Sequence, residues 1–151
     1  MLAPGDPAPD LTLFGVDAEP VRILALAPLL LVFYLYDWTG TWRNELRLLR
    51  DRSGQFQETG VRVVGVSRDS PYSHIEWAKR LGLNYPLLSD WNGEAVRAFG
   101  VAQEMDGLLD TPVRSCFVID AGGVVRFAKA YESSQVPDAD ELLAAARLAA
   151  G

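Results

Sequence analysis

The sequence of 151 residues is 49% hydrophobic and 23% charged, and its formal net charge at pH 7 is −6. These values are ordinary for a globular protein, so we expect one domain over residues 1–151. The acidic balance argues against nucleic-acid binding, because phosphates would be repelled. The longest apolar run, 23–36, is interrupted by Pro28 and is too short to cross a membrane, so no membrane partner is expected.

The chain contains one cysteine, Cys116, and one histidine, His74. A single cysteine excludes an internal disulfide, and this pair of residues argues against the usual structural zinc sites. We therefore expect no metal and no other cofactor. The amino-terminal segment shows no basic stretch leading into an apolar one, so no secretory signal is predicted and a cytoplasmic protein is the expectation.

The sequence alternates between strand and helix patterns, which predicts an α/β sandwich around a mainly parallel sheet. Short strands at 11–14 and 21–24 are expected to pair as a hairpin. A nearly continuous apolar run at 28–36 predicts a central strand that is covered on both faces. A helix is then predicted over 42–58, since apolar residues recur there at spacings of three and four. Its expected inward face consists of Trp42, Leu46, Leu49, Ser53 and Phe56.

The second half of the chain continues the alternation. Residues 61–67 read as another buried strand, and Ser70-Pro71 opens a helix in the favoured order of cap and proline, with Gly82 at its end. The remaining predicted elements are a strand at 85–88, a helix at 92–99, a polar loop at 103–112, a hairpin of strands 113–120 and 124–131, and a helix at 138–149.

A polar loop, Asp37-Trp38-Thr39-Gly40-Thr41-Trp42, joins the central strand to the following helix. This layout resembles the active-site loop of peroxiredoxins, which reads Pro-x-x-x-Thr-x-x-Cys and whose cysteine thiolate attacks peroxide. In the same register this sequence reads Leu35-x-x-x-Thr39-x-x-Trp42. Because an indole is neither a thiolate nor a nucleophile, the usual reaction of the family is not predicted at this position.

Four further phrases resemble the peroxiredoxins in the order that the family has them. They are Gly5-Asp6-Pro7-Ala8-Pro9-Asp10-Leu11-Thr12-Leu13, Val64-Gly65-Val66-Ser67-Arg68-Asp69-Ser70-Pro71, Tyr85-Pro86-Leu87-Leu88-Ser89-Asp90 and Arg114-Ser115-Cys116-Phe117-Val118-Ile119-Asp120. The chain is identified as a member of the peroxiredoxin superfamily and is similar to the bacterioferritin-comigratory and one-cysteine alkyl hydroperoxide reductase E subgroups. The resemblance implies a thioredoxin-like α/β fold with a peroxiredoxin-type amino-terminal extension.

The resemblance also implies which residues form the site. In peroxiredoxins a threonine binds the peroxide, an arginine from a later strand favours the thiolate, and a glutamate three residues after the cysteine orients that arginine. Thr39, Arg114 and Glu45 match these positions, and Trp42 stands at that of the peroxidatic cysteine. A second role is open for Thr39 as a turn or helix cap, and for Arg114 with Glu45 as a structural ion pair. For Trp42 two roles are open: a plug or new binding surface in place of the reactive site, or packing in an unused pocket.

Cys116 is the one thiol that an alternative reaction has to use. Residues two apart share a face of a strand, so Cys116 is expected on the same side as Arg114, where it is a candidate relocated nucleophile. Its apolar neighbours mark a central strand, which favours a small, inert core residue instead. His74 is expected to be a solvated helix residue. Trp38 and Trp91 lie in loops and are candidates for a dimer contact or for capping the core edge.

Two functions follow from these residues. The first is a non-catalytic or strongly altered peroxiredoxin relative with a binding role, whose partner is a hydroperoxide or other small polar ligand, a second copy of the chain, or an active peroxiredoxin. The second is an antioxidant peroxidase that uses Cys116 with an external thiol reductant. The state of Cys116 separates them, because only an accessible, ionised thiol reacts with peroxide.

Overall fold

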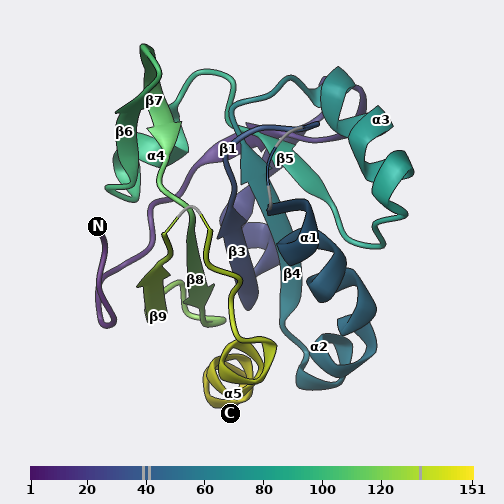
Figure 1. Ribbon diagram of the computed structural model, residues 1–151. Coiled ribbons are helices and arrows are strands. Elements are labelled where there is room, and N and C mark those ends of the chain that lie inside the picture. The colour runs from purple at the N-terminus through teal and green to yellow at the C-terminus, as the bar shows by residue number, and fades with distance from the viewer. Residues whose placement is uncertain (39, 41, 133) are drawn as a thin grey trace.

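The computed structural model describes residues 1–38, 40, 42–132 and 134–151 (Figure 1). The strands are β1 (Thr12–Phe14), β2 (Pro20–Arg22), β3 (Leu29–Phe33), β4 (Arg62–Ser67), β5 (Leu87–Ser89), β6 (Ala102–Met105), β7 (Leu108–Pro112), β8 (Ser115–Ile119) and β9 (Val125–Ala130). The α-helices are α1 (Trp42–Asp51), α2 (Ser53–Thr59), α3 (Pro71–Leu81), α4 (Glu94–Ala98) and α5 (Ala139–Ala150), and short 3₁₀ turns stand at η1 (Val16–Ala18) and η2 (Ile23–Leu26).

Seven of the described strands form one sheet in the order β2-β1-β5-β4-β3-β8-β9. β3 and β5 pair with β4 in parallel, whereas the outer strands pair antiparallel. The prediction of a mainly parallel sheet was therefore wrong: hairpins extend the parallel centre on both sides, and a hairpin can only join antiparallel strands. The α/β class itself is confirmed.

The side chains of β3 alternate between two apolar cores, and every residue of the strand is buried. Leu31 packs with Val96 of α4 on one face of the sheet. Leu30 on the other face packs with Phe56 of α2 and Leu142 of α5. Helices thus cover both faces of the sheet, which explains why the strand reads as a continuous apolar run (Figure 1). No helix in the described part of the chain has the length and apolar character to span a bilayer.

The helix predicted over 42–58 is interrupted at Arg52, whose φ of −100° and ψ of 9° leave the helical region. The two residues that follow, Ser53 and Gly54, have weak helix propensity. The Ser53 hydroxyl also accepts a hydrogen bond from the Asn84 amide at 2.7 Å, which fixes the start of α2 against the segment before β5.

The polar loop predicted at 103–112 is a hairpin of β6 and β7. Its turn is Asp106-Gly107, with φ values of +52° and +80°. Both values suit a tight hairpin turn that favours Asp-Gly, so the sequence did contain a signal for this hairpin. The amino-terminal hairpin is confirmed by the pairing of Thr12 with Arg22, although residues 23–26 form η2 instead of continuing the strand.

Candidate functional site

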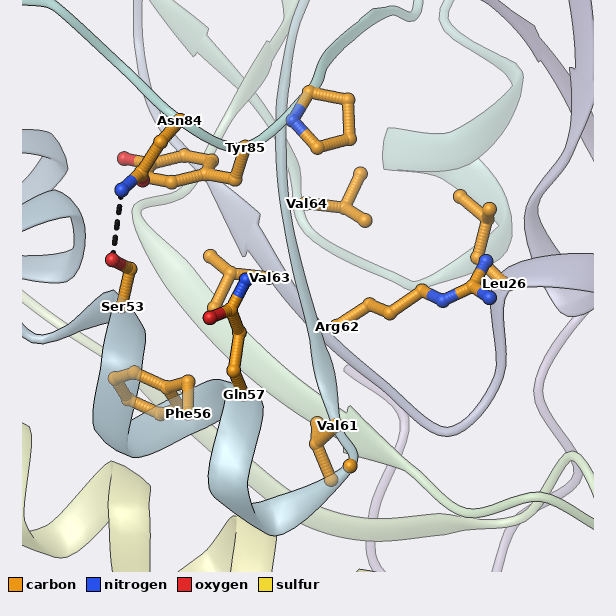
Figure 2. A pocket seen from close by; sticks show the side chains of 12 residues that line it. Leu26, Ser53, Phe56, Gln57, Val61, Arg62, Val63, Val64, Asn84 and Tyr85 are labelled. Carbon is orange, nitrogen blue, oxygen red and sulfur yellow. Dashed lines mark hydrogen bonds between the residues drawn. The ribbon is translucent and has the colours of Figure 1, made fainter.

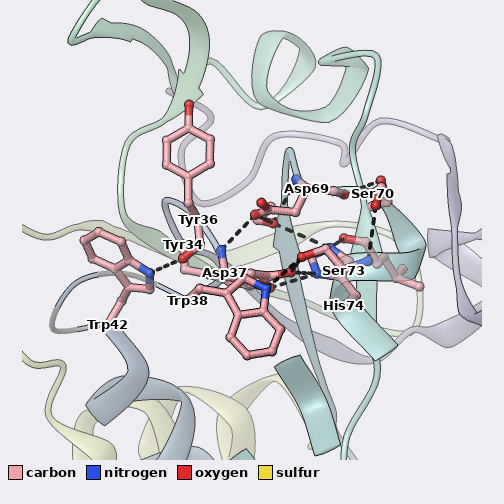
Figure 3. A network of polar contacts seen from close by, with 12 residues as sticks. Tyr34, Tyr36, Asp37, Trp38, Trp42, Asp69, Ser70, Ser73 and His74 are labelled. Carbon is pink, nitrogen blue, oxygen red and sulfur yellow. Dashed lines mark hydrogen bonds and ion pairs between the residues drawn. The ribbon is translucent and has the colours of Figure 1, made fainter. Parts of the chain in front are cut away.

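Trp42 is the first residue of α1, and its side chain is only 8% exposed. The indole Nε1 donates a hydrogen bond to the Tyr36 carbonyl at 2.6 Å, so the ring folds back over the loop that precedes the helix (Figure 3). A methyl group added at Gly40 would lie 2.1 Å from the ring, which means that the indole rests directly on the Gly40 backbone. The loop and the ring are therefore packed against each other.

The apolar cluster around Trp42 joins α1 to α3 beneath the loop. Its buried members are Tyr34, Leu35, Trp42, Leu46, Trp77, Leu81 and Leu87. A buried tryptophan is stabilised by apolar contacts around its ring and by a hydrogen bond from its N–H group, and Trp42 has both. At the position where the resemblance places a reactive cysteine, the structure holds an apolar packing residue.

One helical turn after Trp42, Glu45 forms a buried ion pair with Arg114. The Arg114 Nη2 lies 2.9 Å from the Glu45 Oε2, and the two side chains are 2% and 1% exposed. The Arg114 Nη1 also donates to the Glu132 carbonyl at 2.9 Å. Burial raises the pKa of Glu45 above its ordinary value, and the Arg114 charge opposes that rise. The ion pair expected from the sequence is confirmed.

Cys116 lies on the other side of the same carboxylate. Its thiol is fully buried and donates to the Glu45 Oε1 over 3.8 Å. Arg114 and Cys116 therefore both contact Glu45, as expected of residues two apart on one strand face. Burial, and next the negative charge of Glu45, raise the pKa of the Cys116 thiol well above its usual value. The thiol is thus kept protonated and away from solvent.

A second polar cluster surrounds Asp37, the first polar residue after the apolar run of the central strand. The Tyr34 hydroxyl donates to the Asp37 Oδ1 at 2.6 Å, and the Ser73 hydroxyl donates to the Oδ2 at 2.8 Å. The His74 Nδ1 lies 2.8 Å from the same Oδ2 (Figure 3). These contacts join the loop to the first turn of α3, and the Asp37 side chain is fully buried.

His74 is 3% exposed, so the prediction of a solvated helix residue was wrong. Its Nε2 lies 3.2 Å from the Leu88 carbonyl, which places the ring between α3 and the sheet. The signal was present in the sequence, because His74, Trp77 and Leu81 follow one another at spacings of three and four and share the inward face of α3.

Asp69 extends the cluster to the end of β4. Its Oδ2 accepts hydrogen bonds from the Asp37 amide at 2.9 Å and from the Ser67 hydroxyl at 2.7 Å. Burial, and next the charge of Asp37, raise the pKa of Asp69. The sequence motifs did not predict a site role for Tyr34, Asp37, Ser67 or Asp69. Since β3 and β4 are parallel, polar residues after both strands meet at one edge of the sheet, and this rule could have found them.

Trp38 and Trp91 are 51% and 58% exposed, as expected for loop tryptophans. Trp38 takes a left-handed φ of +71° and is held by a hydrogen bond of 3.1 Å from its indole Nε1 to the Ser73 hydroxyl. Its ring centre lies 5.0 Å from that of Trp77. Thr39, the fourth residue of the expected site, lies outside the described residues.

The sequence matches the model of the AhpC/TSA family over residues 4–128. Alkyl hydroperoxide reductase E of Mycobacterium tuberculosis is 34% identical over 143 residues, which cover 91% of this chain and 92% of that protein. Both findings agree with the resemblance that the loop and strand motifs indicate.

Two solved structures are similar over nearly the whole chain. Peroxidoxin BcpB from Mycobacterium tuberculosis superimposes with a TM-score of 0.88 at 30% identity and covers 98% of both chains. The bacterioferritin comigratory protein of Xanthomonas campestris, described for its alkyl peroxide reduction activity, superimposes with a TM-score of 0.81 at 29% identity and covers 93% of this chain and 92% of that one.

Proposed function

Because this chain belongs to the AhpC/TSA family of peroxiredoxins, we propose that it is a non-catalytic or strongly altered member that serves in binding. The observation that carries the proposal is the packing of Trp42, which stands in the register of the family's cysteine and is buried among apolar side chains. The family's peroxide chemistry needs a thiolate there, and an indole does not supply one.

The chemistry of hydroperoxide reduction supports this proposal. A thiolate sulfur forms a bond to one peroxide oxygen while the O–O bond breaks, and the second oxygen leaves after it takes up a proton. The reacting sulfur must be ionised and must reach the peroxide. Cys116, the single cysteine of the chain, is fully buried and faces the carboxylate of Glu45, which disfavours a second negative charge.

The alternative function is a thiol peroxidase that uses Cys116 and an external thiol reductant. It would require Cys116 to leave the core beneath α1 and to separate from Glu45. The geometry therefore favours the binding function.

Measurement of hydrogen peroxide consumption in the presence of a dithiol reductant distinguishes the binding function from the Cys116 peroxidase. We expect no turnover above the reductant background for the unmodified protein or for Cys116→Ser. We also expect the folded protein to react with a thiol-specific reagent at least about a thousandfold more slowly than the urea-unfolded chain, because the thiol is exposed only on unfolding. Peroxide turnover that disappears in Cys116→Ser would establish the peroxidase function instead.

The exposed apolar side chains near the loop support a protein partner. We define the aromatic rim as Trp38, Tyr72, Trp91 and Leu109, which are between 51% and 71% exposed. The Arg68 guanidinium donates to the carbonyls of Trp91 and Leu109, and this ties two parts of the rim together. Exposed aromatic side chains of this size are enriched at protein interfaces.

The partner proposed for the aromatic rim is a second copy of the chain or an active peroxiredoxin. A hydroperoxide or another small polar ligand remains the alternative partner, but it would have to displace the Trp42 ring from its apolar cluster. The proposed location is the cytoplasm.

Sedimentation or light scattering over a range of protein concentrations tests association through the aromatic rim. We expect a homodimer, and we expect Trp91→Ser to raise its dissociation constant by about tenfold or more, as is common for a central aromatic contact. Leu148→Ser is the matched control, because Leu148 is 82% exposed on α5, away from the rim. A monomeric mass at every concentration would contradict self-association.

A further inference from the structure

A cavity of about 460 Å³ lies beside the amino-terminal half of β4, at the opposite end of that strand from the Asp37 cluster (Figure 2). It exists because β5 is shorter than β4. Pairing between the two strands begins at Gly65 and Leu87, so 62–64 extend past the start of β5. Pro86 stands directly before β5 and has no amide hydrogen to continue the pairing. The sheet therefore has a notch at this place.

The walls of the notch are largely apolar. Phe56 of α2 and Val63 of β4 line it on one side of the sheet, and both are buried. Leu26 of η2 and Val64 of β4 line it on the other side. A volume of this size with apolar walls falls in the range that is usual for small-molecule sites.

Polar groups stand at the rim of the cavity. The Asn84 amide donates to the Ser53 hydroxyl at 2.7 Å across the opening, and Gln57 lies on the next turn of α2 (Figure 2). Because Ser53 uses its oxygen as the acceptor, its hydroxyl proton can be donated to a ligand. The rim therefore offers donors to a polar head group, while the interior suits an apolar body.

The charge on the described lining of the cavity is positive. Among the described residues that line it, Arg62 is the only one with a charged side chain, and it is exposed at the start of β4. Tyr85 also lines the cavity, but its hydroxyl donates to the Leu46 carbonyl at 2.6 Å, and burial raises its pKa, so it stays neutral. The negative net charge of the protein acts at longer range, where salt screens it.

We propose that this cavity binds a small organic monoanion with an apolar body, of the class of medium-chain carboxylates. The alkyl chain would lie against Leu26 and Pro86, two lining side chains that keep exposed surface, and the carboxylate would pair with Arg62 at the mouth. Arg62 presents a guanidinium, the side chain best suited to a carboxylate, and none of the described lining residues is acidic. An alkylammonium of equal chain length carries a positive charge, which the Arg62 guanidinium would repel.

Titration with decanoate, followed through the backbone amide shifts of ¹⁵N-labelled protein, tests the proposal. We expect shifts at 61–64 and 84–86 with a dissociation constant on the order of 1 mM, which is reasonable for a ligand of this size. Decylammonium should bind several-fold more weakly. Arg62→Gln should weaken decanoate binding about two- to fivefold, as expected of an exposed ion pair, and should remove the preference for the anion.

Two variants control this experiment. Arg43→Gln removes an exposed arginine near the start of α1 that does not line the cavity, and it should leave decanoate binding unchanged. Gln57→Trp places a bulky ring on an exposed position of α2 at the rim and should abolish the shifts. Decanoate shifts elsewhere on the protein, equal binding of decylammonium, or full binding by Arg62→Gln would overturn the proposal.

Discussion

Replacement of Arg114 by leucine is expected to lower the free energy of unfolding by about 3–5 kcal/mol, because it leaves the Glu45 carboxylate buried without its cation. Both side chains are almost completely inaccessible, so water cannot take over the role of the guanidinium. Urea unfolding at pH 8 measures the effect. A loss below about 1 kcal/mol, the range of exposed ion pairs, would show that Glu45 is solvated.

The stability of the Arg114→Leu variant should also change with pH in a defined direction. Burial raises the folded-state pKa of Glu45, and removal of Arg114 raises it further. The stability contribution of such a group is complete below its unfolded pKa, near 4.5, and is lost as the pH rises through the folded pKa. The deficit of Arg114→Leu relative to the unmodified protein should therefore be smaller at pH 5 than at pH 8.

The double replacement Glu45→Met with Arg114→Met separates the charge effect from the packing effect. Removal of both partners leaves no unpaired charge, so this variant is expected to be much more stable than Arg114→Leu and close to the unmodified protein. A double variant as unstable as the single one would assign the loss to packing or to the bond between Arg114 and the Glu132 carbonyl.

Trp42→Cys is expected to create a peroxide-reactive thiol at the start of α1. The amino end of a helix favours a thiolate, and Arg114 is held by Glu45, which lies one helical turn after residue 42. Positioned electrostatic stabilisation is worth on the order of 10²–10³ in rate, so we expect peroxide to oxidise this thiol about 100-fold or more faster than it oxidises the same cysteine in the unfolded chain. Stopped-flow measurement of thiol oxidation by hydrogen peroxide gives both rates.

Trp42→Ser provides the matched control, because it removes the indole and adds no thiol. Both variants should lose about 3 kcal/mol of stability, the lower end of the cost of truncating a buried tryptophan. The rate at which hydrogen peroxide oxidises the new thiol should be unchanged in the double variant Trp42→Cys with Cys116→Ser. A folded Trp42→Cys variant that reacts no faster than its unfolded chain would show that the loop no longer has the family's geometry.

The arrangement of buried strands was largely predictable because apolar side chains in a covered sheet leave continuous apolar runs. β3, β4 and β8 lie within the ranges expected for them. The interrupted helix was not predicted, because an apolar face continues from Leu49 to Phe56 while the backbone turns at Arg52. Periodicity reports which face is buried and is insensitive to a local change of backbone angles.

The site was predictable in part. The pairing of Glu45 with Arg114 followed from the resemblance, but the burial of His74 against Asp37 did not, because the two residues are far apart in the sequence and meet only when α3 docks on the sheet. The notch beside Arg62 could not be foreseen either, because it depends on where β5 begins relative to β4. Such features arise from the relative placement of elements.

The sequence by itself determined the family and the chemical identity of residue 42, because motif spacing and side-chain type are properties of the chain alone. It also limited thiol chemistry to Cys116. Only the tertiary structure decided that this thiol is enclosed, since its burial and the nearby charge of Glu45 come from α1 packing onto β8. Solvent access and electrostatic environment depend on side chains brought together from distant parts of the chain, and here both properties disfavour ionisation of the thiol.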